Sequence, residues 1–203
     1  MKKTQILYIH GGMTFRRQKD YEKYLSTIEV SLETRKKWQD EYLDIQLGKN
    51  FEIIRPKMPL KENARYKDWK IVFEKYLKLL DENYILIGFS LGGIFLAKYL
   101  SENKLNKKPK ATFLIGAPFD NTLSDEELCG GFVLKSNLSL LEKNSLNTHL
   151  MFSEDDPIVP VVHAYKFQKK LNKSTFYIYK NKNGHFGVPV FPELVKLIKR
   201  SVE

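Results

Sequence analysis

The fold is decided by the stretch Tyr84-Ile85-Leu86-Ile87-Gly88-Phe89-Ser90-Leu91-Gly92-Gly93. Its apolar start is typical of a buried strand, and the residues after it have the composition of a helix. The pattern G-x-S-x-G joins the two, with Ser90 at its centre. In such a tight strand-to-helix turn the serine has a strained backbone, and its neighbours must be small. The stretch therefore predicts a turn that holds the Ser90 hydroxyl above the end of a strand.

Short apolar runs and longer amphipathic stretches alternate along the rest of the chain, as in β-α-β units. Strands are predicted at 5–9, 51–55, 84–88, 111–116, 149–152 and 175–179. Helices are predicted at 20–47 (in one or two pieces), 66–80, 91–102, 161–171 and 192–200. Right-handed crossovers place helices on both faces of a parallel sheet. We therefore expect an α/β three-layer sandwich with a mostly parallel sheet of about six strands, forming a single domain over 1–203.

The composition is that of a globular protein, with 42% hydrophobic and 29% charged residues in a chain of 203. No segment approaches the roughly 20 apolar residues of a membrane span, and the run at 6–9 is too short for a signal peptide. The single cysteine, Cys129, cannot form an internal disulfide. These observations favour a cytoplasmic protein without a membrane partner.

The chain carries 34 basic and 24 acidic residues, a formal net charge of +10. Most of the basic residues alternate with apolar positions along the whole sequence, which is typical of solvated helix faces. We therefore do not expect nucleic acid to be the main partner.

A serine hydroxyl is a weak nucleophile that needs a general base, and the base needs an orienting carboxylate. His185 lies in the loop Asn183-Gly184-His185-Phe186-Gly187, after the last predicted strand, and is the best candidate for the base. The loop after the strand at 149–152 offers carboxylates at Glu154, Asp155 and Asp156. Asp156 is preferred, Asp155 is the alternative, and helix capping is a further possible role for either aspartate.

A tetrahedral intermediate needs two backbone N–H donors for its oxyanion. The N–H of Leu91, directly after the serine, is one candidate. The turn His10-Gly11-Gly12-Met13 after the first strand offers the other, with Gly12 preferred and Met13 second. We expect His10, Met13, Phe89 and Phe186 to contact the substrate.

The motifs HGG at 10–12, GFSLGG at 88–93, DDPIVP at 155–160 and NGHFG at 183–187 together resemble the α/β-hydrolase superfamily. The short chain, the Asp-Asp-Pro turn and the Gly-His-Phe loop resemble, more narrowly, the compact serine hydrolases of the retinoblastoma-binding protein nine and YdeN type. The resemblance implies a triad of Ser90, Asp156 and His185. It also implies hydrolysis of a small ester, thioester or amide, with carboxylesterase-like activity and no cofactor.

Two segments depart from the pattern. The charged helical region at 16–48 is an insertion relative to that family, and it is left open whether it covers the pocket, forms a homodimer or binds another partner. The polar segment at 119–147 is predicted to be a lid or an irregular excursion.

Arg16 and Arg17 near the first loop, with Lys180 and Lys182 near His185, suggest a substrate with an anionic group. The four histidines and one cysteine show no metal-ligand spacing, so we expect no metal. The alternative function is a non-catalytic binding or scaffolding protein that uses its basic surface.

Overall fold

The computed structural model of the chain describes residues 2–33, 36–123 and 126–203. At its centre lies a six-stranded sheet in the order β2-β1-β3-β4-β5-β6, in which every neighbouring pair is parallel. The strands are β1 (Thr4–Ile9), β2 (Phe51–Ile54), β3 (Tyr84–Phe89), β4 (Ala111–Ile115), β5 (Thr148–Ser153) and β6 (Thr175–Tyr179). All the predicted strands are present, with ends that differ by at most one residue.

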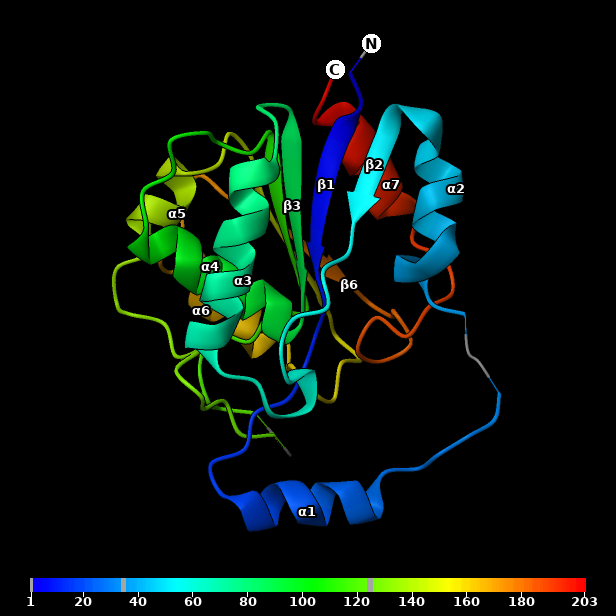
Figure 1. Cartoon of the computed structure of the whole chain (residues 1–203), viewed down its shortest axis with the longest axis vertical. Coiled ribbons are helices and arrows are strands. Elements are labelled where there is room, and N and C mark those ends of the chain that lie inside the picture. The colour runs from blue at the N-terminus through cyan, green and yellow to red at the C-terminus, as the bar shows by residue number, and fades with distance from the viewer. Residues whose placement is uncertain (1, 34–35, 124–125) are drawn as a thin grey trace.

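Helices cover both faces of the sheet (Figure 1), so the predicted three-layer sandwich is confirmed. One face carries α3 (Tyr66–Leu79), α4 (Leu91–Glu102), α5 (Ser139–Lys143) and α6 (Val162–Gln168). The other carries α2 (Leu43–Leu47) and α7 (Pro192–Arg200). Short helical turns lie at Trp38–Tyr42, Gly48–Asn50 and Lys61–Asn63. Within 2–33, 36–123 and 126–203, no helix is long and apolar enough to cross a membrane.

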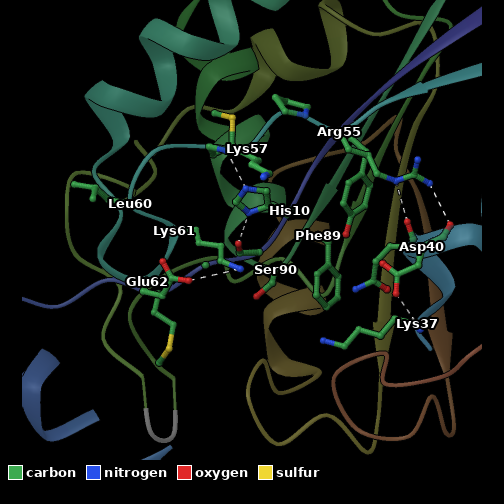
Figure 2. Close-up of a pocket in the computed structure, with 17 residues that line it drawn as sticks. His10, Lys37, Asp40, Arg55, Lys57, Leu60, Lys61, Glu62, Phe89 and Ser90 are labelled. Atoms are coloured by element: carbon green, nitrogen blue, oxygen red, sulfur yellow. Dashed lines mark hydrogen bonds and ion pairs between the residues drawn. The ribbon is translucent and has the colours of Figure 1, made fainter. Parts of the chain in front are cut away.

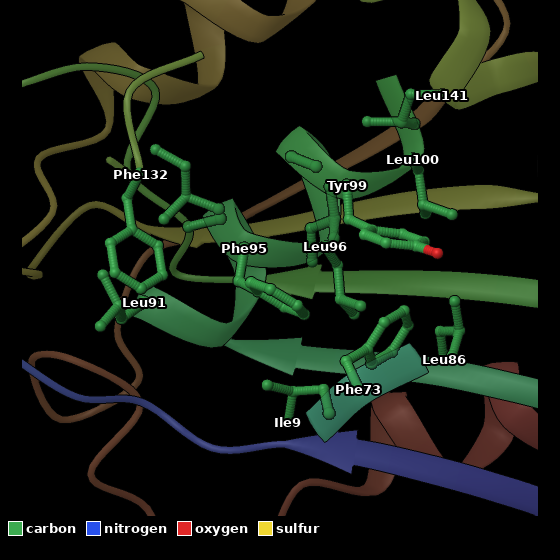
Figure 3. Close-up of a cluster of buried hydrophobic side chains, with 14 of the residues drawn as sticks. Ile9, Phe73, Leu86, Leu91, Phe95, Leu96, Tyr99, Leu100, Phe132 and Leu141 are labelled. Atoms are coloured by element: carbon green, nitrogen blue, oxygen red, sulfur yellow. The ribbon is translucent and has the colours of Figure 1, made fainter. Parts of the chain in front are cut away.

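The core is divided by the sheet into two apolar layers, because successive strand side chains point to opposite faces. In β1, Leu7 packs under α3 and α4, whereas Ile6 packs under α2 and α7. Figure 3 shows the first layer, where Phe73 of α3 meets Phe95 of α4 at a centroid distance of 5.2 Å. Burial of each such side chain contributes about 1.5–3 kcal/mol to stability. The α4 helix that follows Ser90 is therefore firmly held.

The predicted helix at 20–47 is divided in the structure. Helix α1 (Gln18–Thr27) ends at Ile28, whose backbone is extended, and among the described residues the next helical part begins at Trp38. The residues Thr27, Ile28 and Val30 are β-branched, which disfavours continuation of the helix. Helix α1 has no buried residue and lies beyond the carboxyl ends of the strands (Figure 1).

In the segment 119–147, the only helix among the described residues is α5. The lid role of this segment stays a prediction.

The strand order places the candidate residues at one edge of the sheet. The chain passes from β1 to β2 on one side and then returns to β3 on the other side of β1. Loops that leave the carboxyl ends of such neighbouring strands diverge and create a crevice between them. The loop after β1, the turn after β3 and the loops after β5 and β6 all open at this edge.

Candidate active site

Ser90 lies in a strained turn between β3 and α4. Its backbone has φ 54° and ψ −120°, a conformation that is rare for any residue other than glycine. The Ser90 N–H donates a hydrogen bond of 2.8 Å to Ile115 O of β4, which fixes the turn against the sheet. A Cβ at Gly88 would lie 2.4 Å from Gly92 O, and a Cβ at Gly92 would lie 2.2 Å from Ile9 O. The spacing G-x-S-x-G is thus required by close backbone contacts on both sides of the serine.

His185 and Asp156 form a buried pair. The imidazole Nδ1–H donates to Asp156 Oδ2 at 2.6 Å, and the aspartate side chain is only 1% exposed. The other carboxylate oxygen, Oδ1, accepts the N–H groups of Ile158 and Val159, each at 2.9 Å. The aspartate is therefore fixed by backbone donors. With Nδ1 protonated, the other imidazole nitrogen, Nε2, carries the free lone pair.

No hydrogen bond joins Ser90 Oγ to His185 Nε2, which is buried and has no partner among the described residues. The ring is nevertheless placed beside the serine turn. Its centroid lies 4.9 Å from that of Phe89, and a Cβ at Gly116 would lie 2.9 Å from its Cε1. Gly116 has φ 54° and directly follows Ile115, the acceptor of the Ser90 N–H. Catalytic hydrogen bonds are often long before substrate binds.

Asp155 has a different set of contacts from its neighbour. Its carboxylate accepts the Gly184 N–H at 2.8 Å, the Lys182 N–H at 3.0 Å and the Ser153 hydroxyl. Burial acts to raise the pKa of the Asp155 carboxyl, but these hydrogen bonds outweigh it and lower the pKa below its usual value. Asp155 thus holds the loop that carries His185, whereas Asp156 contacts the imidazole itself.

The backbone donors near Ser90 differ in whether they are occupied. The N–H of Leu91, the first residue of α4, has no acceptor within the helix. Among the described residues, no hydrogen bond uses the Gly12 N–H either. In contrast, the Met13 N–H donates to Lys61 O at 2.8 Å. The structure therefore leaves Gly12 and Leu91 available for an oxyanion, whereas Met13 is occupied.

A cavity of about 830 Å³ opens next to Ser90 (Figure 2). His10, Met13 and Phe89 line it, as expected from the sequence. Phe186 does not, because its side chain is only 2% exposed and packs in the core under α7. The expectation that Phe186 contacts the substrate is therefore wrong. Its ring instead fills the space between the histidine loop and the sheet.

His10 is bound through both ring nitrogens. Met58 N–H donates to Nε2 at 3.0 Å, so Nδ1 carries the proton and donates to Gly11 O at 2.6 Å. Burial lowers the pKa of His10, which favours this neutral ring. His10 therefore ties the turn after β1 to the chain that follows β2.

A second, narrow space on the other side of Ser90 is bounded by Glu126, a residue that the sequence reasoning missed. Leu91 and Val159 also line it. Burial raises the pKa of Glu126, and the nearby His185 partly offsets this. The next residue, Glu127, is fixed by an ion pair of 2.7 Å with Arg16.

The basic residues expected to bind an anionic substrate are mostly paired with carboxylates. Arg16 pairs with Glu127, Arg17 with Asp20, and Lys182 with Glu193, each at 2.7 Å. None of these cations lines the cavity beside Ser90. Proximity in sequence to the motifs therefore does not place these cations at the cavity beside Ser90.

Trp38 is a further supporting residue that the sequence reasoning missed. It is fully buried, and it contacts the backbone of the loop that follows His185. A tryptophan inside an otherwise charged stretch is the signal that could have indicated it. In the part of the chain that the structure describes, no group of three or more His, Cys, Asp or Glu residues is arranged to hold a metal ion.

A parallel sheet with a strained serine turn after β3, and with an Asp-His pair on the loops after β5 and β6, defines an α/β hydrolase. The family model described as serine hydrolase matches residues 33–190, and the chain belongs to this family. No curated protein sequence matches the chain.

Several solved structures share the fold. YdeN of B. subtilis has a TM-score of 0.77 at 19% identity, with 98% of each chain covered. A YdeN-like hydrolase of Pectobacterium atrosepticum has a TM-score of 0.65 at 15% identity, covering 98% of this chain and 91% of that one. The esterase Pf2001 of Pyrococcus furiosus has a TM-score of 0.58 at 16% identity, covering 100% and 84%. The family match confirms the predicted serine hydrolase, and these structures show that the chain shares the fold of YdeN.

Proposed function

We propose that the protein is a carboxylesterase-like serine hydrolase that cleaves a small ester, thioester or amide through an acyl-enzyme at Ser90. In this proposal His185 is the general base and Asp156 orients it. The observation that carries the proposal is the 2.6 Å contact between His185 Nδ1 and the buried Asp156 carboxylate, in the loop beside the serine turn.

The reaction follows from the protonation states. His185 Nε2 takes the proton of the Ser90 hydroxyl as Oγ attacks the carbonyl carbon of the substrate. The imidazolium that forms is stabilised by Asp156. Oriented N–H groups at Gly12 and Leu91 stabilise the negative charge on the carbonyl oxygen. Each such donor typically contributes about 10²–10³ in rate.

Collapse of the tetrahedral intermediate then breaks the bond to the leaving group, which takes the proton from His185 Nε2. Water, deprotonated by the same nitrogen, attacks the acyl-enzyme and releases the acid. His185 thus serves first as a base and then as an acid in each half-reaction. The fixed Asp156 keeps the ring in the tautomer that both steps require.

The test is covalent labelling with a fluorophosphonate probe, beside turnover of a short neutral 4-nitrophenyl ester. Wild-type protein should be labelled, S90A should not, and H185A should be labelled far more slowly. Ester turnover should be highest in the wild type, much lower in H185A and lowest in S90A. A folded wild type that neither reacts with the probe nor hydrolyses the ester would contradict the proposal and favour a binding role.

A further inference from the structure

The cavity beside Ser90 is bordered by more basic than acidic side chains. Its charged lining consists of Lys37, Arg55, Lys57, Lys61, Asp40 and Glu62. The basic members come from the segment before α2 and from the connection between β2 and α3. They therefore surround the cavity from two directions.

Two of these cations are already paired with carboxylates. Arg55 Nη2 lies 2.6 Å from an Asp44 carboxylate oxygen, and its other nitrogens donate to backbone and side-chain oxygens nearby. Lys61 Nζ lies 3.6 Å from Glu62 Oε1, a long and exposed contact. These pairs reduce the positive charge that Arg55 and Lys61 present to a ligand.

Lys37 and Lys57 differ from Arg55 and Lys61 in their contacts. Neither ammonium has an ion-pair partner within residues 2–33, 36–123 and 126–203, although both residues line the cavity. The Asp40 carboxylate, the nearest in sequence to Lys37, instead accepts the Lys37 backbone N–H at 3.2 Å. In Figure 2 the Lys37 side chain extends from its backbone toward the side of the cavity where Phe89 and Ser90 lie. An unpaired ammonium at the wall of such a cavity attracts anions.

We propose that this cavity binds a negatively charged group of the substrate, a carboxylate or a phosphate, through Lys37 and Lys57. The preferred substrates are then small anionic esters whose charge lies a few bonds from the scissile carbonyl. This inference rests on the proposed function, because it names the class of substrate for the same Ser90.

The experiment compares 4-nitrophenyl esters of equal length. The mono-ester of glutarate carries a carboxylate, the glutaramate ester carries a neutral amide in its place, and the 4-phosphonobutanoate ester carries a phosphonate. We expect kcat/KM for the glutarate ester to exceed that for the glutaramate ester by about tenfold at low ionic strength. Each exposed lysine is expected to contribute a few-fold to this ratio. The phosphonate arm distinguishes carboxylate from phosphate recognition.

Variants and salt test the origin of the preference. K37Q and K57Q should each lower the ratio of glutarate to glutaramate efficiency about threefold, and the double variant should bring it near one. The matched control is K75Q, an exposed lysine of α3 that does not line the cavity. Added salt should also reduce the ratio, since the Debye length falls from about 10 Å at 0.1 M to about 3 Å at 1 M.

The outcomes separate this inference from the proposed function. Hydrolysis of the glutaramate ester that depends on Ser90, with no preference for either anion, would overturn the inference and leave the function intact. A preference that persists in the double variant would also overturn it. If no ester is hydrolysed and the probe does not label Ser90, both fail together.

Discussion

The indole Nε1–H of Trp38 donates a hydrogen bond of 3.1 Å to the carbonyl oxygen of Phe186, the residue directly after His185. The Trp38 backbone N–H also donates to Val188 O at 3.2 Å. One residue from the segment before α2 thus fixes the loop of the candidate base at two points. Its ring is buried against Phe89, which itself contacts the imidazole.

The first prediction concerns this contact. W38F keeps an aromatic ring in the core but removes the N–H donor and part of the volume. We expect a loss of about 1–3 kcal/mol in the free energy of unfolding and a fall in kcat of roughly tenfold. Urea unfolding and ester kinetics measure the two effects. The control is F73L, a core variant in α3, which should lose about as much stability as W38F with little change in kcat. If kcat falls equally in F73L and W38F, the effect on the rate is not specific to the loop.

The second prediction separates the two neighbouring aspartates. D156N should lower kcat by about 10³–10⁴, because the imidazole loses the carboxylate that holds its tautomer. D155A should lower stability by about 1–3 kcal/mol, because the N–H groups of Gly184 and Lys182 lose their acceptor, and should reduce kcat less. Kinetics with the neutral ester and urea unfolding provide the comparison. A larger loss of kcat in D155A than in D156N would contradict the prediction, because it would indicate that Asp155 orients the imidazole and Asp156 holds the loop.

The third prediction uses two glycines that both have a positive φ but have different surroundings. Gly116 has φ 54°, and a Cβ there would lie 2.9 Å from His185 Cε1; Gly48 has φ 69° with nothing within 4 Å of such a Cβ. Both G116A and G48A should lose about 1–3 kcal/mol of stability through backbone strain. Only G116A should displace the imidazole and lower kcat, by roughly 10- to 100-fold. Equal activity of the two variants would contradict a positioning role for Gly116.

Much of this architecture could be predicted from the sequence, because buried parallel strands have a strong local signal. The serine turn was equally local, since its glycines are needed within a few residues of Ser90. Charge pairing could not be predicted from a local pattern, because it depends on residues that are distant in sequence. Arg16, for example, pairs with Glu127, 111 positions away. For the same reason the sequence did not indicate Lys37 and Lys57, on which the proposed anion binding rests. The burial of Phe186 likewise depends on packing that no local pattern encodes.

The fourth prediction concerns acid stability. Burial lowers the pKa of His10, His149 and His163 below the ordinary value of 6.5. Below about pH 6.5 the unfolded chain therefore binds protons that the folded chain does not, so the free energy of unfolding decreases as pH falls. Near pH 7.5 these rings are neutral in both states and the penalty is absent.

Urea unfolding at pH 7.5, 6.5 and 5.5 measures this slope. The depressed pKa of Asp155 acts in the same direction but below about pH 4, outside this window. The raised pKa of Glu126 acts in the opposite direction, but it is one carboxyl against three histidines. H163N, which removes a fully buried titrating ring, should be less stable at pH 7.5 and have a shallower slope than the wild type. A wild type that is equally stable at pH 5.5 and 7.5 would contradict the prediction.

The strand order has a consequence for how activity arises during synthesis. After β3, each new strand is added at the same edge of the sheet, through β4 and β5 to β6. A nascent chain that has passed Asp156 already contains the serine turn and the proposed acid, but it still lacks His185, the proposed base. Since N-terminal parts leave the ribosome first, the histidine joins an almost complete scaffold. In the proposed mechanism, hydrolytic capacity is thus acquired in one late event, and partly made chains remain inert.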